Sequence, residues 1–518
     1  MLTSRTIWII VVLWGRLLYF APVADASSAE SFVYTNNDGC LGNTVSGFSV
    51  GVAGEMTPIL GSPFPTAGQG TCGGFYSANR IVGTAVRNLL FVSNGASQDV
   101  TVFSVDAATG VLVPIPGSPF PAPGGRAISV AITPDAKFLI AAAGSSVHVY
   151  AIADSGQLTP VDGSPFLAPS VVYSIKISPN GKFLAAGLPD VGIAGAVGMW
   201  SIGAEGTLAQ VTGSPFLGAS SLDEGALTGL DINCAGTRLF AGVANADGTG
   251  VNVFALASDG VLTPISSSPF EFPELGENSS VVALSPDDKT LFVSNQDSNT
   301  IAVFGVDAAG DLALVPGSPF PSGGSYKPGG MALDQAGKFL FVADSSKELD
   351  VFGIAGDGAL TSVAGSPFPV DTETWGLNSL VAFPGKACWV PFGSFEVQQL
   401  AIYRHAFTMT STFTLARESH GFDPLVESVT LLIGRYTITI PAGFFRRKPL
   451  GEFVYRGKIG DVQMDVSITR LSERRYWFRA NGWGRGVDLA GTKNPVTVQL
   501  FPGTNQGTVE VNAHIYPW

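Results

Sequence analysis

Short runs of alternating apolar and polar residues, separated by turn residues, repeat along most of this chain. The clearest unit has four such runs, at residues 280–286, 290–295, 299–307 and 312–320. Alternation with period two, rich in Val, Ile, Phe and Thr, predicts β-strands. Asp287-Asp288-Lys289 and residues 308–311 supply the Asp and Gly that tight turns favour. The pattern therefore predicts an antiparallel unit of four strands.

Each unit ends in a Ser-Pro-Phe corner, which is preceded by glycine in six of seven copies. The serines of the seven copies are Ser62, Ser118, Ser164, Ser214, Ser268, Ser318 and Ser366. Successive copies lie 56, 46, 50, 54, 50 and 48 residues apart. Four strands repeated at this period predict a β-propeller. Because proline cannot donate to a strand ladder, we expect the corner to end the outermost strand and its phenylalanine to pack between blades.

The first unit of the repeat lacks an inner strand, which a segment at the far end of the repeat region can supply. Residues 31–37, 44–51 and 56–64 match the second, third and fourth strands of a unit, and residues 376–384 match the inner one. These segments predict a closed ring of seven blades, which removes open sheet edges. A further hairpin at 387–404 is either a connector from the ring or part of an eighth, incomplete blade.

The repeat stops after about residue 404. Residues 405–518 keep alternating strands but lose the period and the corner, so they predict a separate small β-sandwich. The expected organisation is an all-β chain with a signal peptide at 1–26, a seven-bladed propeller at 27–404 and the sandwich at 405–518. An outer-membrane barrel is disfavoured because barrels lack a repeat of this length.

The first 26 residues have the pattern of an export signal. Arg5 precedes an apolar run at residues 6–14, and Ala24-Asp25-Ala26 suits a cleavage site. We therefore expect a secreted, periplasmic or cell-surface protein with no transmembrane segment in the mature chain.

The net charge and its distribution along the chain disfavour one class of partner. Only 13% of residues are charged and the net charge is −13. Residues 405–518 hold 13 basic and 9 acidic residues, so the excess of acid lies in the propeller region. An acidic ring is a poor match for nucleic acid, which is not expected as a partner.

The four cysteines match no zinc spacing, and neither a metal nor a cofactor is expected. Cys40 and Cys72 fall in two loops on the same face of the propeller, so we predict a disulfide between them. Cys234 and Cys388 are expected to be unpaired and mostly buried. Oxygen-rich loops such as Asn295-Gln296-Asp297 are interpreted as turns rather than calcium sites.

Two possible catalytic features are better explained by packing. His148 lies in a predicted third strand, away from the ring axis, and is interpreted as a packed residue. Gly47-Phe48-Ser49-Val50-Gly51 has the spacing of a nucleophile elbow, but that motif needs a strand–turn–helix context. Here it aligns with third strands of other units, so we interpret it as a strand.

The repeat resembles the YVTN type, in Phe292-Val293-Ser294-Asn295 and in Phe32-Val33-Tyr34-Thr35-Asn36. Together with the turn Ser285-Pro286-Asp287-Asp288-Lys289, it is similar to the seven-bladed lactonase-like propellers of the 6-phosphogluconolactonase type. The resemblance covers roughly residues 31–400 and implies that fold. It also implies, as a possible activity, hydrolysis of a lactone by Arg and His at the start of inner strands.

The loops that lead into the inner strands are the candidate functional surface, because loops on a rigid scaffold carry most binding residues. The candidate ligand-binding residues are Arg126, Asp223, Glu224, Glu277, Asn278, Tyr326, Lys327 and Trp375. None of these loops holds an Arg-His pair, and only Gly124-Gly125-Arg126 keeps an arginine. The preferred hypothesis is an exported binding module for a carbohydrate, peptide or protein. The alternative is a lactone hydrolase, a carboxylic ester hydrolase of the 6-phosphogluconolactonase kind.

Overall fold

The computed structural model describes most of the chain beyond residue 30. The residues outside the description are 1–30, 73–78, 126–127, 190, 192–194, 219–225, 245–248, 324–326, 371–378, 387, 389, 417–418, 420, 426, 435, 442, 450, 504 and 517–518. Strands dominate the described residues, which contain one short 3-10 helix, η1 (Pro273–Leu275), and no α-helix.

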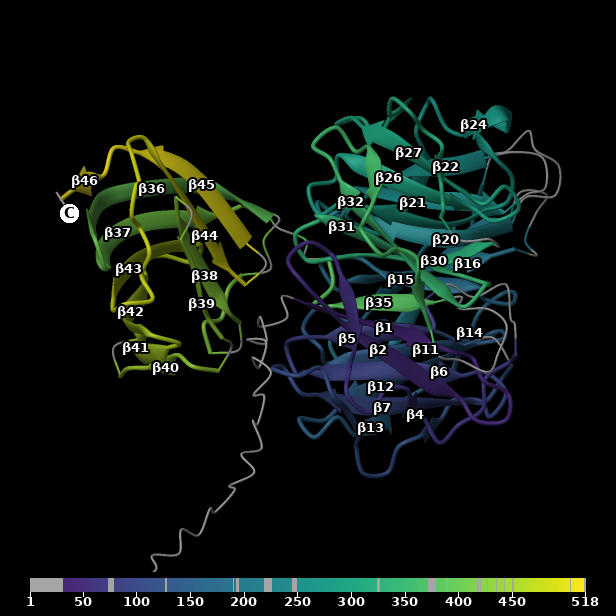
Figure 1. Ribbon diagram of the computed structural model, residues 1–518. Coiled ribbons are helices and arrows are strands. Elements are labelled where there is room, and N and C mark those ends of the chain that lie inside the picture. Colours follow the sequence, from purple (N-terminus) through teal and green to yellow (C-terminus); the bar gives the residue numbers. More distant parts are fainter. Residues whose placement is uncertain are drawn as a thin grey trace, which may run out of the picture.

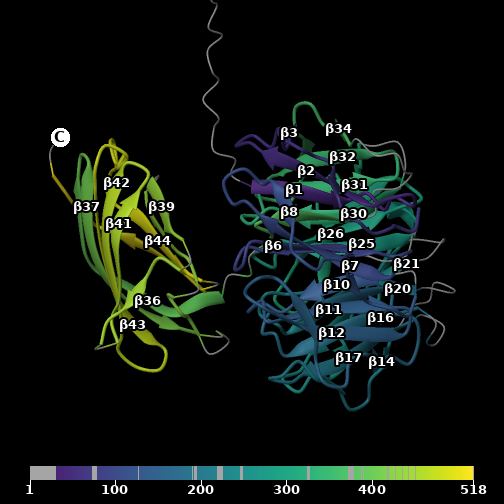
Figure 2. The same ribbon diagram turned by 90° about the horizontal axis from the view of Figure 1, so that it is seen from below.

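Seven similar sheets are arranged around a common axis and form the predicted propeller (Figures 1 and 2). The innermost strands are β35 (Leu380–Phe383), β5 (Ile81–Thr84), β10 (Ile128–Ile132), β15 (Ser174–Ile177), β20 (Ala226–Ile232), β25 (Ser279–Leu284) and β30 (Pro328–Leu333). The second strands are β1 (Ser31–Asn36), β6 (Leu89–Asn94), β11 (Phe138–Ala143), β16 (Phe183–Leu188), β21 (Arg238–Ala244), β26 (Thr290–Asn295) and β31 (Phe339–Asp344). In this order the sheets are called blades one to seven.

The third and fourth strands complete each blade. The third strands are β2 (Thr44–Val50), β7 (Asp99–Val105), β12 (Ser146–Ile152), β17 (Ala196–Ile202), β22 (Thr249–Leu256), β27 (Thr300–Val306) and β32 (Glu348–Ile354). The fourth begins with β3 (Met56–Pro58), β8 (Leu112–Pro114), β13 (Leu158–Pro160), β18 (Leu208–Gln210), β23 (Leu262–Pro264), β28 (Leu312–Leu314) and β33 (Leu360–Ser362). It resumes after the corner as β4 (Phe64–Pro65), β9 (Phe120–Pro121), β14 (Phe166–Leu167), β19 (Phe216–Leu217), β24 (Phe270–Phe272), β29 (Phe320–Pro321) and β34 (Phe368–Pro369).

The Ser-Pro-Phe corner is an excursion within the outer strand, not its end. Both halves of the outer strand pair with the same third strand, as β3 and β4 pair with β2. The corner serine bridges the gap, since the Ser62 hydroxyl accepts the Gly47 backbone N–H at 2.9 Å. The same bond recurs in the other six blades, from the backbone N–H groups of Val102, Val149, Met199, Val253, Val303 and Val351. Serine thus supplies the acceptor that the interrupted ladder lacks.

The corner phenylalanines pack between blades, as the sequence predicted. Phe64 is buried, with 6% of its surface exposed, and belongs to an apolar cluster that also contains Phe103 of blade two. The other six are half-buried and contact the apolar clusters between neighbouring blades. Each cluster combines residues of adjacent sheets, such as Phe91 and Leu139, so these contacts hold the ring together.

The ring closes as the sequence predicted, with strands from both ends of the propeller in blade one. β35 pairs antiparallel with β1, with Phe32 opposite Phe383 and Thr35 opposite Leu380. β1 continues into β2 and β3, so the blade order is β3-β2-β1-β35. There are seven such sheets and no eighth blade among the described residues.

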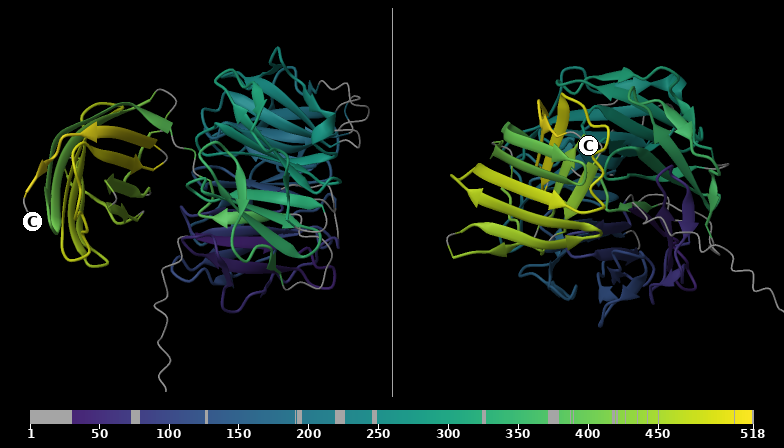
Figure 3. Two further views of the ribbon diagram at one scale, coloured as in Figure 1. Left: turned by 45° about the horizontal axis from the view of Figure 1, so that its top comes forward. Right: turned by 60° about the vertical axis from the view of Figure 1, so that its left-hand side comes forward.

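The C-terminal domain forms one continuous sheet that folds over on itself (Figure 3). Its strands are β36 (Val390–Tyr403), β37 (Ala406–Leu415), β38 (Val429–Ile433), β39 (Tyr436–Ile440), β40 (Arg446–Arg447), β41 (Phe453–Ile459), β42 (Val462–Arg470), β43 (Arg475–Trp483), β44 (Val496–Pro502), β45 (Asn505–Val511) and β46 (His514–Ile515). The order is β39-β38-β44-β45-β36-β37-β43-β42-β41-β40, with β46 beside β36. One apolar core lies between the two halves and contains Leu431 and Val498 as well as Phe413 and Phe478.

The boundary between the two domains differs from the predicted position at residue 404. The segment expected to form a hairpin at 387–404 instead contains one long strand, β36, which pairs with β37 and β45 of the C-terminal sheet. This strand belongs neither to the ring nor to an eighth blade. Phe392 and Phe395 on β36 pack against the C-terminal core, and this burial favours the C-terminal sheet over the propeller.

Candidate functional site

The face on which each inner strand begins is the candidate site, and we call it the funnel face. It carries the loops that lead into the inner strands and the loops that join second to third strands. Five of the eight candidate residues, Arg126, Asp223, Glu224, Tyr326 and Trp375, lie outside the described residues. Glu277, Asn278 and Lys327 are described, and they lie on the funnel face before β25 and at the start of β30.

Asp297 brings these three predicted residues together. It lies in the loop between β26 and β27 and binds Lys327 Nζ at 2.8 Å. Asn278 Nδ2 donates to the second Asp297 oxygen at 3.1 Å. Two further bonds fix the same loops, because the Glu277 backbone N–H donates to Ser298 Oγ at 2.7 Å and the Asp297 backbone N–H donates to the Glu277 carbonyl at 3.3 Å. The result is a polar rim on blades six and seven, on which the Glu277 side chain is exposed.

Sequence analysis missed Asp297 as part of a site and noted it only in an oxygen-rich loop. Its partners are 19 and 30 positions away along the chain, counted from Asn278 and Lys327. The signal that could have found it is the alignment of units, which places each second-to-third loop beside the loops that lead into inner strands.

A small polar cavity lies on the ring axis below this rim. Its lining includes Asn79, Ser379, Gly329, Gly330 and Met331, and it has room for about one water molecule, about 10 Å³. Asn79 holds φ at +63° and its Nδ2 donates to the Ile175 carbonyl of blade four at 3.1 Å. This cavity is therefore too small for a ligand larger than water.

Three neighbouring inner strands are bulged where they begin. Register shifts lie between Leu227 and Gly229 in β20, Ser279 and Val281 in β25, and Pro328 and Gly330 in β30. Bulges re-aim side chains and are frequent beside functional sites. Blades five to seven therefore present a different surface to the funnel from the other blades.

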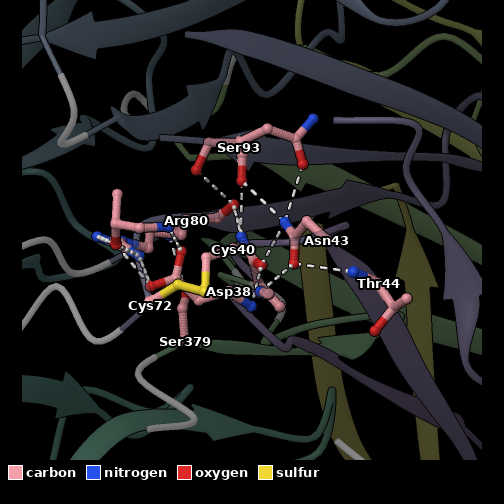
Figure 4. A network of polar contacts seen from close by, with 12 residues as sticks. Asp38, Cys40, Asn43, Thr44, Cys72, Arg80, Ser93 and Ser379 are labelled. Carbon is pink, nitrogen blue, oxygen red and sulfur yellow. Dashed lines mark hydrogen bonds and ion pairs between the residues drawn. A yellow bond between two sulfur atoms is a disulfide. The ribbon is translucent and has the colours of Figure 1, made fainter. Parts of the chain in front are cut away.

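A buried polar network joins blades one and two on the funnel face (Figure 4). Arg80 Nη1 lies 2.8 Å from Asp38 Oδ2, and both side chains are at most 3% exposed. Asp38 also accepts bonds from the backbone N–H and the hydroxyl of Thr71, at 2.7 and 2.6 Å. The Arg80 backbone N–H donates to Ser379 Oγ at 2.9 Å, which links this network to the strand that closes the ring.

The Cys40–Cys72 disulfide lies beside this network and joins the two loops from which the pairing was predicted (Figure 4). Asn43 Nδ2 extends the network by donating to Asn36 Oδ1 at 2.9 Å and to Asn94 Oδ1 at 2.8 Å. Because these groups are buried and bonded to one another, we assign them a structural role in holding blades one and two together.

The opposite face of the ring is crossed by a segment that we call the connector, of which the structure describes Pro384, Gly385, Lys386 and Cys388. Gly385 bridges to Asp334 of blade seven, and Lys386 Nζ lies 2.8 Å from Asp231 Oδ2 in blade five. Lys176 of blade four binds the other Asp231 oxygen at 2.8 Å. The connector thus leads from blade one past blade seven to blade five.

A second disulfide, Cys234–Cys388, fastens the connector, so the prediction that both cysteines are unpaired is wrong. Cys234 lies in the turn after β20, and Cys388 precedes β36 rather than lying within a strand. The backbone N–H of Cys234 donates to Asp288 at 2.8 Å. The two cysteines meet because the chain leaves blade one past blade seven toward blade five, a path that the spacing of cysteines in the sequence does not reveal.

The charges under the connector are buried and mutually dependent. Burial alone would raise the pKa of Asp231, but Lys176 and Lys386 hold it well below its usual range. Burial lowers the pKa of Lys386, an effect that Asp231 opposes. This cluster therefore ties blades four and five to the connector on the face opposite the funnel.

His148 is a packed residue, as interpreted from the sequence. It is 5% exposed, its Nε2 lies 2.6 Å from the Pro123 carbonyl oxygen, and its ring stacks on Tyr150. Burial lowers its pKa. It lies in β12, a third strand, and is therefore not placed to act as a base on the funnel axis.

Two further properties concern the described residues as a whole. They contain no group of three His, Cys, Asp or Glu side chains that could hold a metal ion. Their helical content is limited to one short 3-10 turn, so no described helix is long and apolar enough to cross a bilayer.

The described residues form a closed seven-bladed propeller. Residues 243–376 match the family described as "Lactonase, 7-bladed beta-propeller", which confirms the resemblance found in the repeat. No curated protein matches this chain in sequence.

Solved structures share the propeller. A candidate 6-phosphogluconolactonase from Bacteroides fragilis has a TM-score of 0.55 at 20% identity, covering 69% of this chain and 99% of its own. A second candidate, from Bacteroides uniformis, has a TM-score of 0.53 at 19% identity, covering 66% and 97%. A periplasmic gluconolactonase of Pseudomonas aeruginosa has a TM-score of 0.50 at 21% identity, covering 67% and 99%. At these identities the likeness shows the fold alone.

Proposed function

We propose that this protein is an exported binding protein whose funnel face holds a polar ligand, a carbohydrate, a peptide or a protein. The observation that carries the proposal is the pairing of two described cations on that face. Arg80 is buried against Asp38, and Lys327 is bound to Asp297. Hydrolysis of a phosphorylated lactone needs cationic groups directed at the substrate. The described rim instead offers Glu277 and Asn278, which suit hydroxyl and amide donors.

Export is supported by two disulfides, which persist in oxidising compartments. It is also consistent with the apolar run at residues 6–14 and with the periplasmic origin of one structural neighbour. We therefore place the protein outside the cytoplasm, in the periplasm, at the cell surface or in the medium.

The alternative function is a lactone hydrolase, which the family match of residues 243–376 favours. The first experiment is a hydrolysis assay of mature protein, residues 27–518, on a lactone panel that includes 6-phosphogluconolactone. Turnover that falls in Arg126→Ala would establish an enzyme and overturn the binding proposal.

Binding is tested by glycan and peptide arrays followed by titration of the best ligand. We expect Glu277→Gln to weaken binding about fivefold or more, the loss of one charge-assisted hydrogen bond. Glu274→Gln is the matched control, because Glu274 is an exposed carboxylate of η1 only three residues away. Equal affinity of wild type and Glu277→Gln would place the ligand elsewhere and contradict the proposal.

A further inference from the structure

A row of exposed aromatic rings lies on the outer face of the C-terminal sheet. Tyr403 pairs with Ala406, and Ala406 pairs with Trp483 on the next strand, so these residues share one row across β36, β37 and β43. Trp483 is 47% exposed and Tyr403 is 39% exposed. Tyr516 stacks on Tyr403 with ring centroids 4.4 Å apart and is also 39% exposed. The small Ala406 leaves the surface flat between the rings.

The alternation of each strand fixes which side these rings face. Phe407, Met464 and Phe478 belong to the buried core, so their neighbours along the strands point outward. This outer side of β37, β43 and β42 is turned away from the propeller in both views (Figures 1 and 2). The aromatic row is therefore open to a partner from solvent.

A second tryptophan extends the surface along β43. Trp477 lies six positions before Trp483 on the same side of the strand, roughly 20 Å away at the usual rise per residue. Polar side chains lie between the two rings. Arg479 and Asn481 come from β43, and Asn481 pairs with Asp465 on β42. The surface is thus long, with rings at both ends and hydrogen-bonding groups between them.

The charge of this surface is positive. Asp465 lies 3.3 Å from Arg456 Nε and 3.9 Å from Arg479 Nη2, so one carboxylate is shared by two guanidinium groups. Lys458 and Arg475 add cations on the same side of the sheet. The acidic residues on this side are Glu396, in the row of Trp477, and Asp461, which lies 3.3 Å from Lys458 Nζ. The C-terminal segment as a whole is basic in a chain that is otherwise acidic. An anionic partner complements this face.

We propose that the outer face of β36, β37, β43, β42 and β41 binds a linear acidic polysaccharide, a chain of uronic acid residues. The apolar C–H face of a pyranose ring stacks on an exposed aromatic ring, whose face is electron-rich. Hydroxyl groups bond to Asn481 and Asp465, and carboxylates pair with Arg479 and Arg456. The length between Trp477 and Trp483 suits an extended polymer rather than a single sugar. This site is separate from the funnel face and stands independently of its proposed function.

The test is titration of the full mature chain with polygalacturonate oligomers and with neutral galactan oligomers of the same length. We expect the acidic oligomers alone to bind, more weakly as salt rises. Trp483→Ala and Tyr403→Ala should each weaken binding about fivefold or more, because each removes one stacking surface. Arg479→Gln should weaken binding and reduce its dependence on salt.

Phe444→Ala is the matched control, because Phe444 is 54% exposed on the same domain but lies outside the aromatic row. Its affinity and thermal midpoint should equal those of wild type, and the thermal midpoints of the other variants show whether they are folded. No binding by wild type, equal binding of neutral oligomers, or full affinity in folded Trp483→Ala overturns the proposal. Binding of oligo-dT that exceeds that of polygalacturonate would assign the face to single-stranded nucleic acid instead and also overturn it.

Discussion

The serine of the repeated corner shows how one hydroxyl can decide local structure. In every blade it accepts a backbone N–H of the third strand where the outer strand leaves the ladder. The sequence marked this residue as part of a turn, but its acceptor role depends on the position of the neighbouring strand. That position follows only from the pairing of third and fourth strands.

Replacing one of these serines should cost a measurable part of the stability. We expect Ser268→Ala to lower the free energy of unfolding by about 1–2 kcal/mol, because the N–H of buried Val253 loses its acceptor. Urea unfolding is the measurement. Ser266→Ala, at an exposed position of the same turn, should change it by less than about 0.5 kcal/mol. Equal effects of the two substitutions would show that the hydroxyl does not support the ladder.

Asp231 is a residue whose contribution depends on pH. Its pKa is depressed in the folded state by Lys176 and Lys386, against the effect of burial. Its stabilisation is therefore complete above the unfolded pKa, about 3.9, and is lost as the pH falls through the lower folded-state pKa. We expect Asp231→Asn to lower the free energy of unfolding strongly at pH 7, because Lys176 and Lys386 lose their anionic partner. The difference in the free energy of unfolding between wild type and this variant should become smaller below about pH 4.

The measurement is chemical unfolding of both proteins between pH 7 and pH 2. Asp135→Asn is a surface control, since Asp135 is half exposed and pairs with Lys137 on its own turn. A difference between wild type and Asp231→Asn that stays constant over this range would contradict the role assigned to the buried carboxylate.

At the scale of elements, the connector is the feature that the sequence did not reveal. Its residues have no counterpart in other units, so the repeat that predicts everything around them says nothing about their path. Residues 387–404 alternate like a blade hairpin, but alternation alone does not show which sheet they join or that they form one strand, β36. The choice depends on Phe392 and Phe395, which find an apolar core only in the C-terminal sheet.

Removing the disulfide that holds the connector should loosen the propeller itself. We expect Cys234→Ser with Cys388→Ser to lower the free energy of unfolding by about 2–4 kcal/mol, because the bond closes a segment of 154 residues. The double variant Cys40→Ser with Cys72→Ser serves for comparison. It should lose less free energy of unfolding, because these two cysteines are only 32 positions apart in the sequence. Unchanged stability of the first variant would mean that the Lys386–Asp231 pair suffices to hold the connector.

At the scale of the molecule, the ring could be predicted because each blade carries a copy of a repeated motif that can be counted in the sequence. Seven corners, a first unit without an inner strand and a spare strand at 376–384 lead to the observed pairing of β1 with β35. The funnel site could be predicted only in part. Three of its described residues meet at Asp297, but that meeting depends on loops from two blades, whose approach no local pattern encodes.

The assignment of β36 predicts where the chain can be divided. Residues 27–389 should give a folded, soluble propeller, because they end before β36 and keep the connector with both disulfides. Residues 27–404 should aggregate, because β36 then exposes Phe392, Phe395 and an unpaired edge. Gel filtration and thermal unfolding of the two products are the measurements. Equal elution and equal thermal unfolding of the two products would favour a domain boundary at residue 404 instead.

The position of the Cys234–Cys388 bond also determines how the two domains transmit force. If the C-terminal sheet is held by a polymer and the propeller is pulled by its own ligand, tension enters the ring at the turn after β20. It bypasses β35, whose four paired residues close the ring and would otherwise be peeled away from β1 one at a time. The disulfide therefore bears the tension, and the hydrogen bonds between β35 and β1 do not.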